Sequence, residues 1–161
     1  MQVFIMRHGD AALEAASDAV RPLTICGCDE SRQMASWLNS QAPDIDRVLV
    51  SPYLRAQQTL ATVREALKLP EGEEVLPELT PGGDPGQVAC YLHALASQGV
   101  KSVLVISHLP LVGYLVSELC HHETPPMFAT SAIACVNVED ATQGNGTLVW
   151  QVSPSKLAKA I

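Results

Sequence analysis

The sequence predicts an α/β fold, a three-layer sandwich with a mostly parallel central sheet and an antiparallel hairpin at its C-terminal edge. Short continuous apolar runs, typical of strands buried on both faces, occur at Val3–Met6, Val48–Val50 and Ser102–Ile106. Segments with helical spacing of apolar residues separate these runs, as crossovers between parallel strands require. Two alternating segments, Ile133–Val138 and Thr147–Val152, predict the hairpin.

The first two helices have recognisable starting residues. Thr24 belongs to the class that caps helix N-termini, and it predicts a helix that runs to about Asn39. Ser51 and Pro52 predict the next start, because proline fits a first-turn position where its missing N–H costs nothing. The apolar residues that these helices would bury are Met34, Trp37, Leu38, Leu60, Val63 and Leu67.

The remaining elements follow in order. Glu74–Leu76 is a brief strand, and the glycine- and proline-rich segment Pro81–Gly86 is a loop before a helix from about Gln87 to Ser97. Pro110 opens another helix that reaches about Leu119. A turn at Gly144–Gly146 joins the strands of the hairpin.

Composition narrows the class of protein. Of 161 residues, 47% are apolar and 17% are charged, which predicts one domain over residues 1–161 with a single sizeable core. The formal net charge of −7 argues against nucleic acid as a partner. Apolar segments fall short of the roughly 20 residues of a membrane span, so no membrane association is expected. The five cysteines, an odd and scattered set, do not suggest a disulfide framework, and the cytoplasm is the expected compartment.

Polar side chains follow three of the predicted strands. Arg7 and His8 follow the first, Arg55 lies one turn into the helix after the second, and His108 follows the third. Ligands of open α/β sheets bind at the carboxyl ends of the strands, near helix N-termini. Two guanidinium groups and two imidazoles would therefore meet there and form a site for a tetrahedral phosphoryl group.

These residue types suit a covalent mechanism. A neutral imidazole is a competent nucleophile near neutral pH and forms a phosphoramidate. The arginines would neutralise the phosphoryl oxygens, and the second imidazole could donate to them. Because positioning and electrostatics supply most of the acceleration in phosphoryl transfer, neither a metal nor a cofactor is required.

The same motifs resemble the histidine phosphatase superfamily, whose members include the cofactor-dependent phosphoglycerate mutases. The matching segments are Met6–Gly9, Ser51–Ala56 with Thr59, Ser107–His108, and Arg21–Thr24 with Gly27. The resemblance covers nearly the whole chain. It implies that His8 is the transient phosphate acceptor, that Arg7, Arg55 and His108 complete the phosphate pocket, and that Arg21 contacts the substrate.

Within that superfamily the chain is most similar to the SixA-type phosphohistidine phosphatases of bacteria. Ser107–Gly113, Val75–Pro81 and the minimal length carry this similarity. Larger members add a helical lid with an acidic proton donor, whereas the segment from Pro70 to Glu78 leaves little room for one. Glu78 is a candidate donor by sequence order alone. A lidless site suits phosphohistidine on another protein, such as a histidine phosphotransfer domain or a phosphocarrier, because its P–N bond needs little acid catalysis.

Other interpretations stay open at this point. A small-molecule phosphomonoesterase of the sugar-phosphate type is the main alternative, although a small substrate gains from enclosure. A mutase or a phosphoprotein-binding module without turnover fits less well. Cys26 and Cys28 do not form a complete zinc set, and only His121 and His122 could complete it.

The other cysteines and one histidine are assigned to structural places. Cys90, Cys120 and Cys135 are expected in the core, and His93 on a helix surface.

Overall fold

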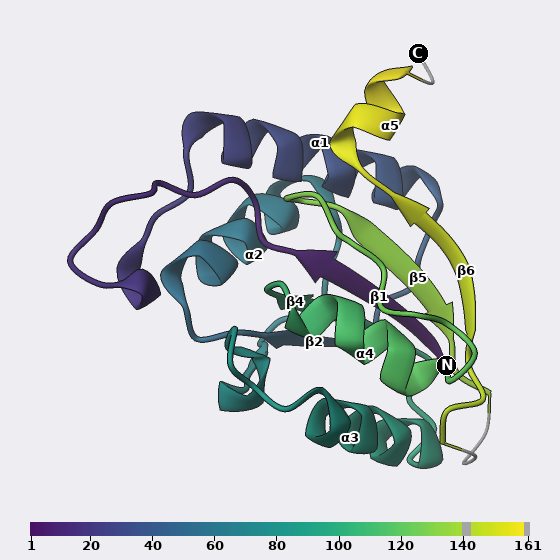
Figure 1. Cartoon of the computed structure of the whole chain (residues 1–161). Coiled ribbons are helices and arrows are strands. Elements are labelled where there is room, and N and C mark those ends of the chain that lie inside the picture. The colour runs from purple at the N-terminus through teal and green to yellow at the C-terminus, as the bar shows by residue number, and fades with distance from the viewer. Residues whose placement is uncertain (140–142, 160–161) are drawn as a thin grey trace.

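A six-stranded sheet forms the centre of the computed structural model, which describes residues 1–139 and 143–159 (Figure 1). Its strands are β1 (Gln2–Arg7), β2 (Arg47–Val50), β3 (Glu74–Val75), β4 (Ser102–Ser107), β5 (Ile133–Asn137) and β6 (Thr147–Val152). They lie in the order β3-β2-β4-β1-β5-β6. The first four are parallel, and β5 and β6 add antiparallel pairs at one edge. The predicted fold class is confirmed.

Helices cover both faces of this sheet. The helices are α1 (Ile25–Ser40), α2 (Leu54–Ala66), α3 (Pro85–Ser97), α4 (Leu111–Leu119) and α5 (Pro154–Lys159), with short 3₁₀ turns η1 (Asp18–Val20) and η2 (Pro77–Leu79). In Figure 1, α1 and α2 lie on one side of the sheet and α3 and α4 on the other. Among the described residues, no helix has both the length and the apolar character to cross a membrane.

Each face of the sheet has its own apolar core. Ile5 of β1 packs in the core under α3 and α4, whereas its neighbours Phe4 and Met6 pack in the core under α1 and α2. Side chains of a strand alternate between faces, so a central strand of a three-layer sandwich must be apolar at consecutive positions. This explains the continuous apolar run that predicted β1.

The predicted helix starts are confirmed in part. Thr24 is the N-cap of α1, and its Oγ1 accepts a hydrogen bond from the Gly27 N–H at 3.0 Å. The first-turn position predicted for Pro52 is wrong, because α2 begins at Leu54 with Tyr53 as its N-cap. The helix α3 begins two residues earlier than predicted, since the carboxylate of its N-cap, Asp84, accepts from the first backbone N–H groups.

The C-terminal hairpin is confirmed, but its turn is longer than predicted. Asn137 pairs with Thr147, so the connection covers residues 138–146, of which 140–142 lie outside the described residues. The Gly144–Gly146 segment is not a tight turn between the strands. It lies against the end of α4, where the Gly146 N–H donates to the Leu119 carbonyl at 2.8 Å and Gly144 accepts from the His121 N–H.

Two burial predictions on α3 are wrong. Cys90 is exposed, whereas His93 is only 6% exposed. They share a helix whose inner face is set by Val88, Leu92 and Leu95, and His93 lies at the margin of that buried face. The expected burial of Cys120 and Cys135 is confirmed.

Candidate active site

The candidate site lies where β1, β2 and β4 end. Register brings their carboxyl ends level, because Arg7 pairs with Ser107 and Val50 pairs with Ile106. The residues after each strand therefore lie at one edge of the sheet. The rings of His8 and His108 are 5.0 Å apart between centroids, so the structure brings together two residues that are distant in sequence.

The His8 ring is buried and held in one orientation. Its Nδ1 is 2.7 Å from the carbonyl oxygen of Gly9, a distance at which an Nδ1–H donates. This partner assigns the proton to Nδ1 and leaves a lone pair on Nε2. The Nε–H of Arg55 donates to that Nε2 at 3.3 Å, which agrees with the assignment. The nucleophilic atom of His8 is thus Nε2, whose lone pair accepts from Arg55 in this structure.

The surroundings of His8 favour the neutral ring. Burial lowers the pKa of His8 to about 4, and the charges of Arg55, Arg7 and Arg21 act in the same direction against the opposing Gly9 carbonyl. A neutral imidazole retains the lone pair that a nucleophile needs. The site therefore keeps His8 reactive across the neutral pH range.

Two arginines flank the nucleophile. Arg55 is 4% exposed, and besides His8 it contacts Asp18 and lies 5.1 Å from the centre of the Tyr53 ring. Arg7 donates from Nη1 to the Phe128 carbonyl oxygen at 3.0 Å. Its buried Nε has no hydrogen-bond partner within the part of the chain that the structure describes.

His108 is the second imidazole of the site and is 1% exposed. Its Nε2 is 2.7 Å from the Ser51 hydroxyl oxygen, which also accepts from the Tyr53 N–H. The Ser51 hydroxyl can donate its own proton to Nε2, and in that tautomer the ring proton of His108 lies on Nδ1. That Nδ1 is buried and lacks a partner among residues 1–139 and 143–159. Burial, followed by the charges of His8 and Arg55, lowers the pKa of His108 to about 3.

The turn after His8 is fixed by contacts with α1 and α2. The Thr59 Oγ1 accepts from the Gly9 N–H at 3.0 Å and donates to the Arg55 carbonyl oxygen at 2.7 Å. On the other side, a Cβ atom at Gly27 would lie 2.2 Å from the Asp10 carbonyl oxygen. Only glycine permits this approach of α1 to the turn.

The two further residues singled out in the sequence lie in different places. Arg21 is part of the site's surroundings, since its Nη1 donates to Asp18 at 3.0 Å and its Nε donates to the Ala12 carbonyl oxygen. Glu78 lies in η2 and lines a groove with Leu76 and residues of α3. No hydrogen bond among the described residues joins Glu78 to His8 or His108, and its role as a proton donor stays a prediction.

Sequence reasoning missed Asp18. Its carboxylate contacts both Arg21 and Arg55, at 3.0 and 3.2 Å. Its spacing of three residues from Arg21 was the only local signal, and such a pair is common on protein surfaces. The contact with Arg55 depends on how the loop between β1 and α1 folds back onto α2.

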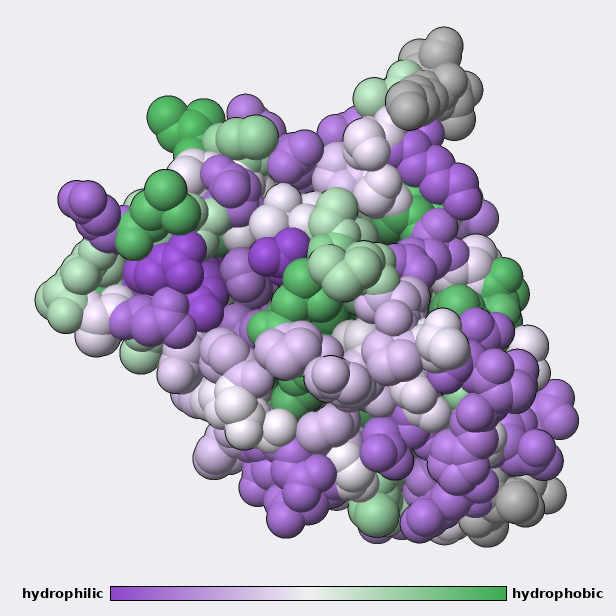
Figure 2. Space-filling view, in the orientation of Figure 1, coloured by the Kyte–Doolittle hydropathy of each residue, from purple (hydrophilic) through white to green (hydrophobic). Residues whose placement is uncertain are grey.

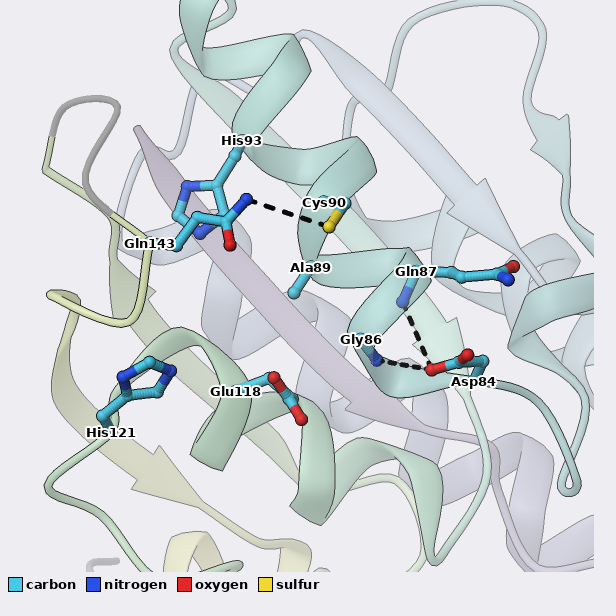
Figure 3. A pocket seen from close by; sticks show the side chains of 9 residues that line it. All are labelled: Asp84, Gly86, Gln87, Ala89, Cys90, His93, Glu118, His121 and Gln143. Atoms are coloured by element: carbon cyan, nitrogen blue, oxygen red, sulfur yellow. Dashed lines mark hydrogen bonds between the residues drawn. The ribbon is translucent and has the colours of Figure 1, made fainter.

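A separate hollow lies between α3, α4 and the hairpin connection, away from the four site residues. Its volume is about 390 Å³, and Figure 3 shows Cys90 and His93 of α3 on one side and Glu118 and His121 on the other. Cys26 and Cys28 lie instead at the start of α1. Within the described residues, no group of three or more histidine, cysteine or acidic side chains is arranged to hold a metal ion.

Comparison with known proteins agrees with this geometry. The family model of the histidine phosphatase superfamily (branch 1) matches residues 3–83. The phosphohistidine phosphatase SixA of Escherichia coli K12 is 68% identical over the full length of both chains. A SixA homolog of Haemophilus influenzae is 43% identical and covers 83% of this chain and 86% of its own.

A solved structure extends the similarity to three dimensions. The structure of the protein histidine phosphatase SixA complexed with tungstate superposes with a TM-score of 0.95 at 69% identity. It covers 98% of this chain and 99% of that one.

Proposed function

The chain belongs to the histidine phosphatase superfamily, and from this premise we infer that it is a phosphohistidine phosphatase. The observation that carries this function is the full-length identity of 68% to a phosphohistidine phosphatase. The convergence of His8, His108 and two arginines at one sheet edge supplies a chemical basis for it.

We propose that His8 is the covalent catalyst. Its Nε2 lone pair attacks the phosphorus of a phosphohistidine, a P–N bond forms to His8, and the P–N bond to the substrate imidazole breaks. The departing imidazole nitrogen takes a proton from solvent, which it accepts readily because imidazole is basic. Water then attacks the phosphorus on His8, and inorganic phosphate leaves with Nε2 again unprotonated.

The unpartnered donors of the site support a role in holding the phosphoryl group. Arg7 Nε and His108 Nδ1 are both buried and lack hydrogen bonds to the described residues. An unsatisfied buried donor costs about 1–3 kcal/mol, so such atoms are expected to have a partner in the working state. Phosphoryl oxygens would provide acceptors for both. They would also accept the Arg55 Nε–H, which donates to His8 Nε2 in this structure, once that lone pair attacks phosphorus.

We further propose that the phosphate arrives on another protein. Exposed apolar side chains lie on segments that flank the site: Leu13 is 89% exposed and Val20 46% on the loop that carries Asp18, and Met127, next to the Arg7 acceptor Phe128, is 78% exposed. Figure 2 shows hydrophobic residues on this protruding loop beside strongly hydrophilic ones. Exposed apolar residues around a polar site fit a protein surface better than a sugar phosphate.

The proposed partners are histidine phosphotransfer domains or phosphocarrier proteins, and the proposed role is signal transduction by a two-component phosphorelay. We propose that residues 1–161 act as one domain without a helical lid.

We place the enzyme in the cytoplasm, a reducing compartment that suits the five free cysteines.

A substrate panel tests the proposed function. The wild-type protein should release phosphate from a phosphohistidine-bearing phosphotransfer domain much faster than from sugar phosphates. His8→Ala should abolish release and lose the acid-labile label that the wild type carries during turnover. His122→Ala, which removes an exposed histidine, is the matched control and should retain full activity. Faster hydrolysis of sugar phosphates would favour the small-molecule alternative, and binding without release would favour a binding module.

A second panel of variants tests whether the exposed apolar residues Leu13, Val20 and Met127 contact the partner protein. Leu13→Ser should raise KM for the phosphoprotein severalfold and leave the hydrolysis of free phosphohistidine unchanged. Val149→Ser, at an exposed apolar residue of β6, is the control and should alter neither. An equal effect of both variants on the phosphoprotein would contradict docking at the loop.

A further inference from the structure

Asp18 connects two of the arginines around the nucleophile. It is the first residue of η1, on the loop between β1 and α1, and its side chain is 54% exposed. Its Oδ1 accepts from Arg21 at 3.0 Å and its Oδ2 accepts from Arg55 at 3.2 Å. Its backbone carbonyl oxygen accepts from Arg55 Nη1 at 2.6 Å. One residue thus supplies acceptors to both terminal nitrogens of Arg55.

These contacts determine which edge of Arg55 faces His8. A guanidinium group is planar, and its five N–H donors keep fixed relative directions. With Nη1 and Nη2 both bound by Asp18, the Nε–H is left to point at His8 Nε2, where the structure finds it at 3.3 Å. Asp18 is the only acidic side chain that pairs with Arg55 in residues 1–139 and 143–159.

The Asp18 carboxylate also brings negative charge to an anion site. Hydrogen bonds from Arg21 and then Arg55 lower the pKa of Asp18, so it is ionised at neutral pH. A phosphate ion bound by Arg55 would therefore lie near a carboxylate of the same sign of charge, and the two anions would repel each other. This repulsion acts on bound inorganic phosphate for as long as it remains in the site, and it favours release of the product.

We propose that Asp18 is a positioning residue of the phosphatase: it directs the Nε–H of Arg55 toward His8, and its charge keeps the affinity of the site for inorganic phosphate low. This inference rests on the proposed function, because it assigns Asp18 a role in the turnover of that site. Loss of a merely structural residue would weaken phosphate binding and activity together, whereas loss of the Asp18 charge should strengthen phosphate binding and lower activity.

The test compares Asp18→Asn with the wild type. Asparagine keeps the size of the side chain and the backbone acceptor, and it removes the charge. Calorimetric titration with inorganic phosphate should show binding about threefold to tenfold tighter in Asp18→Asn, the effect of one partly exposed charge. Its kcat on a phosphohistidine protein should fall about tenfold, since Arg55 loses part of its orientation. Asp18→Ala should lose more kcat, because no side-chain acceptor remains.

A matched control removes the same charge from the same loop. Glu14 is exposed and makes no ion pair within the described part of the chain, so Glu14→Gln should change phosphate affinity and kcat less than twofold. The Arg55 Nε–H signal in a ¹⁵N NMR spectrum, protected from exchange in the wild type, should lose protection in Asp18→Ala. Thermal melting of each variant shows whether it is folded.

The outcomes separate this inference from the proposed function. Unchanged or weaker phosphate binding in a folded Asp18→Asn protein would overturn the charge effect, and an unchanged kcat would overturn the positioning role. Both phosphate binding and the Arg55 signal are measured without turnover. A wild-type protein that fails to hydrolyse phosphohistidine would refute the proposed function while these two measurements still judge Asp18.

Discussion

Replacement of Thr59 by valine tests how α2 holds the turn that carries His8. Thr59 is fully buried, and its hydroxyl accepts from the Gly9 N–H, 50 residues away in sequence, and donates to the Arg55 carbonyl oxygen. Valine has nearly the same shape and similar helix propensity, so Thr59→Val leaves no cavity of note. Its main effect is to leave the buried Gly9 N–H without an acceptor.

The expected loss of stability follows from the unsatisfied Gly9 N–H alone. A buried donor left unsatisfied costs about 1–3 kcal/mol, whereas the Arg55 carbonyl oxygen keeps its helical hydrogen bond. We expect the free energy of unfolding to fall by about 2 kcal/mol, which lowers Tm by about 6 °C in a domain of this size. Since Gly9 follows His8 directly, kcat on a phosphohistidine substrate should also fall.

Urea denaturation and phosphatase assays measure both effects. Thr62→Val is the matched control on the same helix, because the Thr62 hydroxyl only donates to the Gln58 carbonyl oxygen, and its loss leaves no N–H unsatisfied. The control should lose less than about 0.5 kcal/mol. If Thr59→Val proved as stable and as active as Thr62→Val, the turn would not depend on this hydrogen bond.

Three further predictions concern packing, pH and metal dependence. Gly27→Ala should destabilise the protein by about 2–4 kcal/mol, because its Cβ would lie 2.2 Å from a backbone oxygen, whereas Gly82→Ala, with open space around it, should be neutral in a melting experiment. His8 and His108, with pKa values of about 4 and about 3, stay neutral in the folded protein while the unfolded chain takes up protons below about pH 6.5. Stability should therefore fall as the pH drops from 6.5 toward 4, by about 3 kcal/mol at pH 5; NMR titration midpoints near 6.5 for both rings would contradict this. A chelator should leave phosphate release unchanged, and lost activity that zinc restores would point to a metal site.

The apolar pattern of the sequence was sufficient to predict the fold. Strands buried on both faces must be apolar at consecutive positions, and Val3–Met6 and Ser102–Ile106 show this directly. Because parallel strands end at the same edge, the residues that follow these runs could be placed together before any contact was known. Arg7, His8 and His108 were found in this way.

Local sequence patterns predicted burial and turns less well where these depend on contacts with residues distant in sequence. The burial of His93 and the exposure of Cys90 depend on how α3 is rotated against the sheet. The two residues lie only one helical turn apart, so the sequence does not show which of them faces the core. The Gly144–Gly146 segment resembles a tight turn locally, yet its backbone bonds with the end of α4. Tertiary packing outweighed the local preference in both cases.

The order of residues specifies which chemical groups follow each strand, and therefore that imidazoles and guanidinium groups meet at one sheet edge. Which nitrogen of His8 carries the lone pair depends on the folded structure, because the Gly9 carbonyl and Arg55 set it. The folded structure also decided that Asp18 joins the site, through a contact with Arg55 that spans 37 residues. Hydrogen bonds are directional and short, so residue order can bring groups to the same edge, but only the folded backbone sets which atoms face each other.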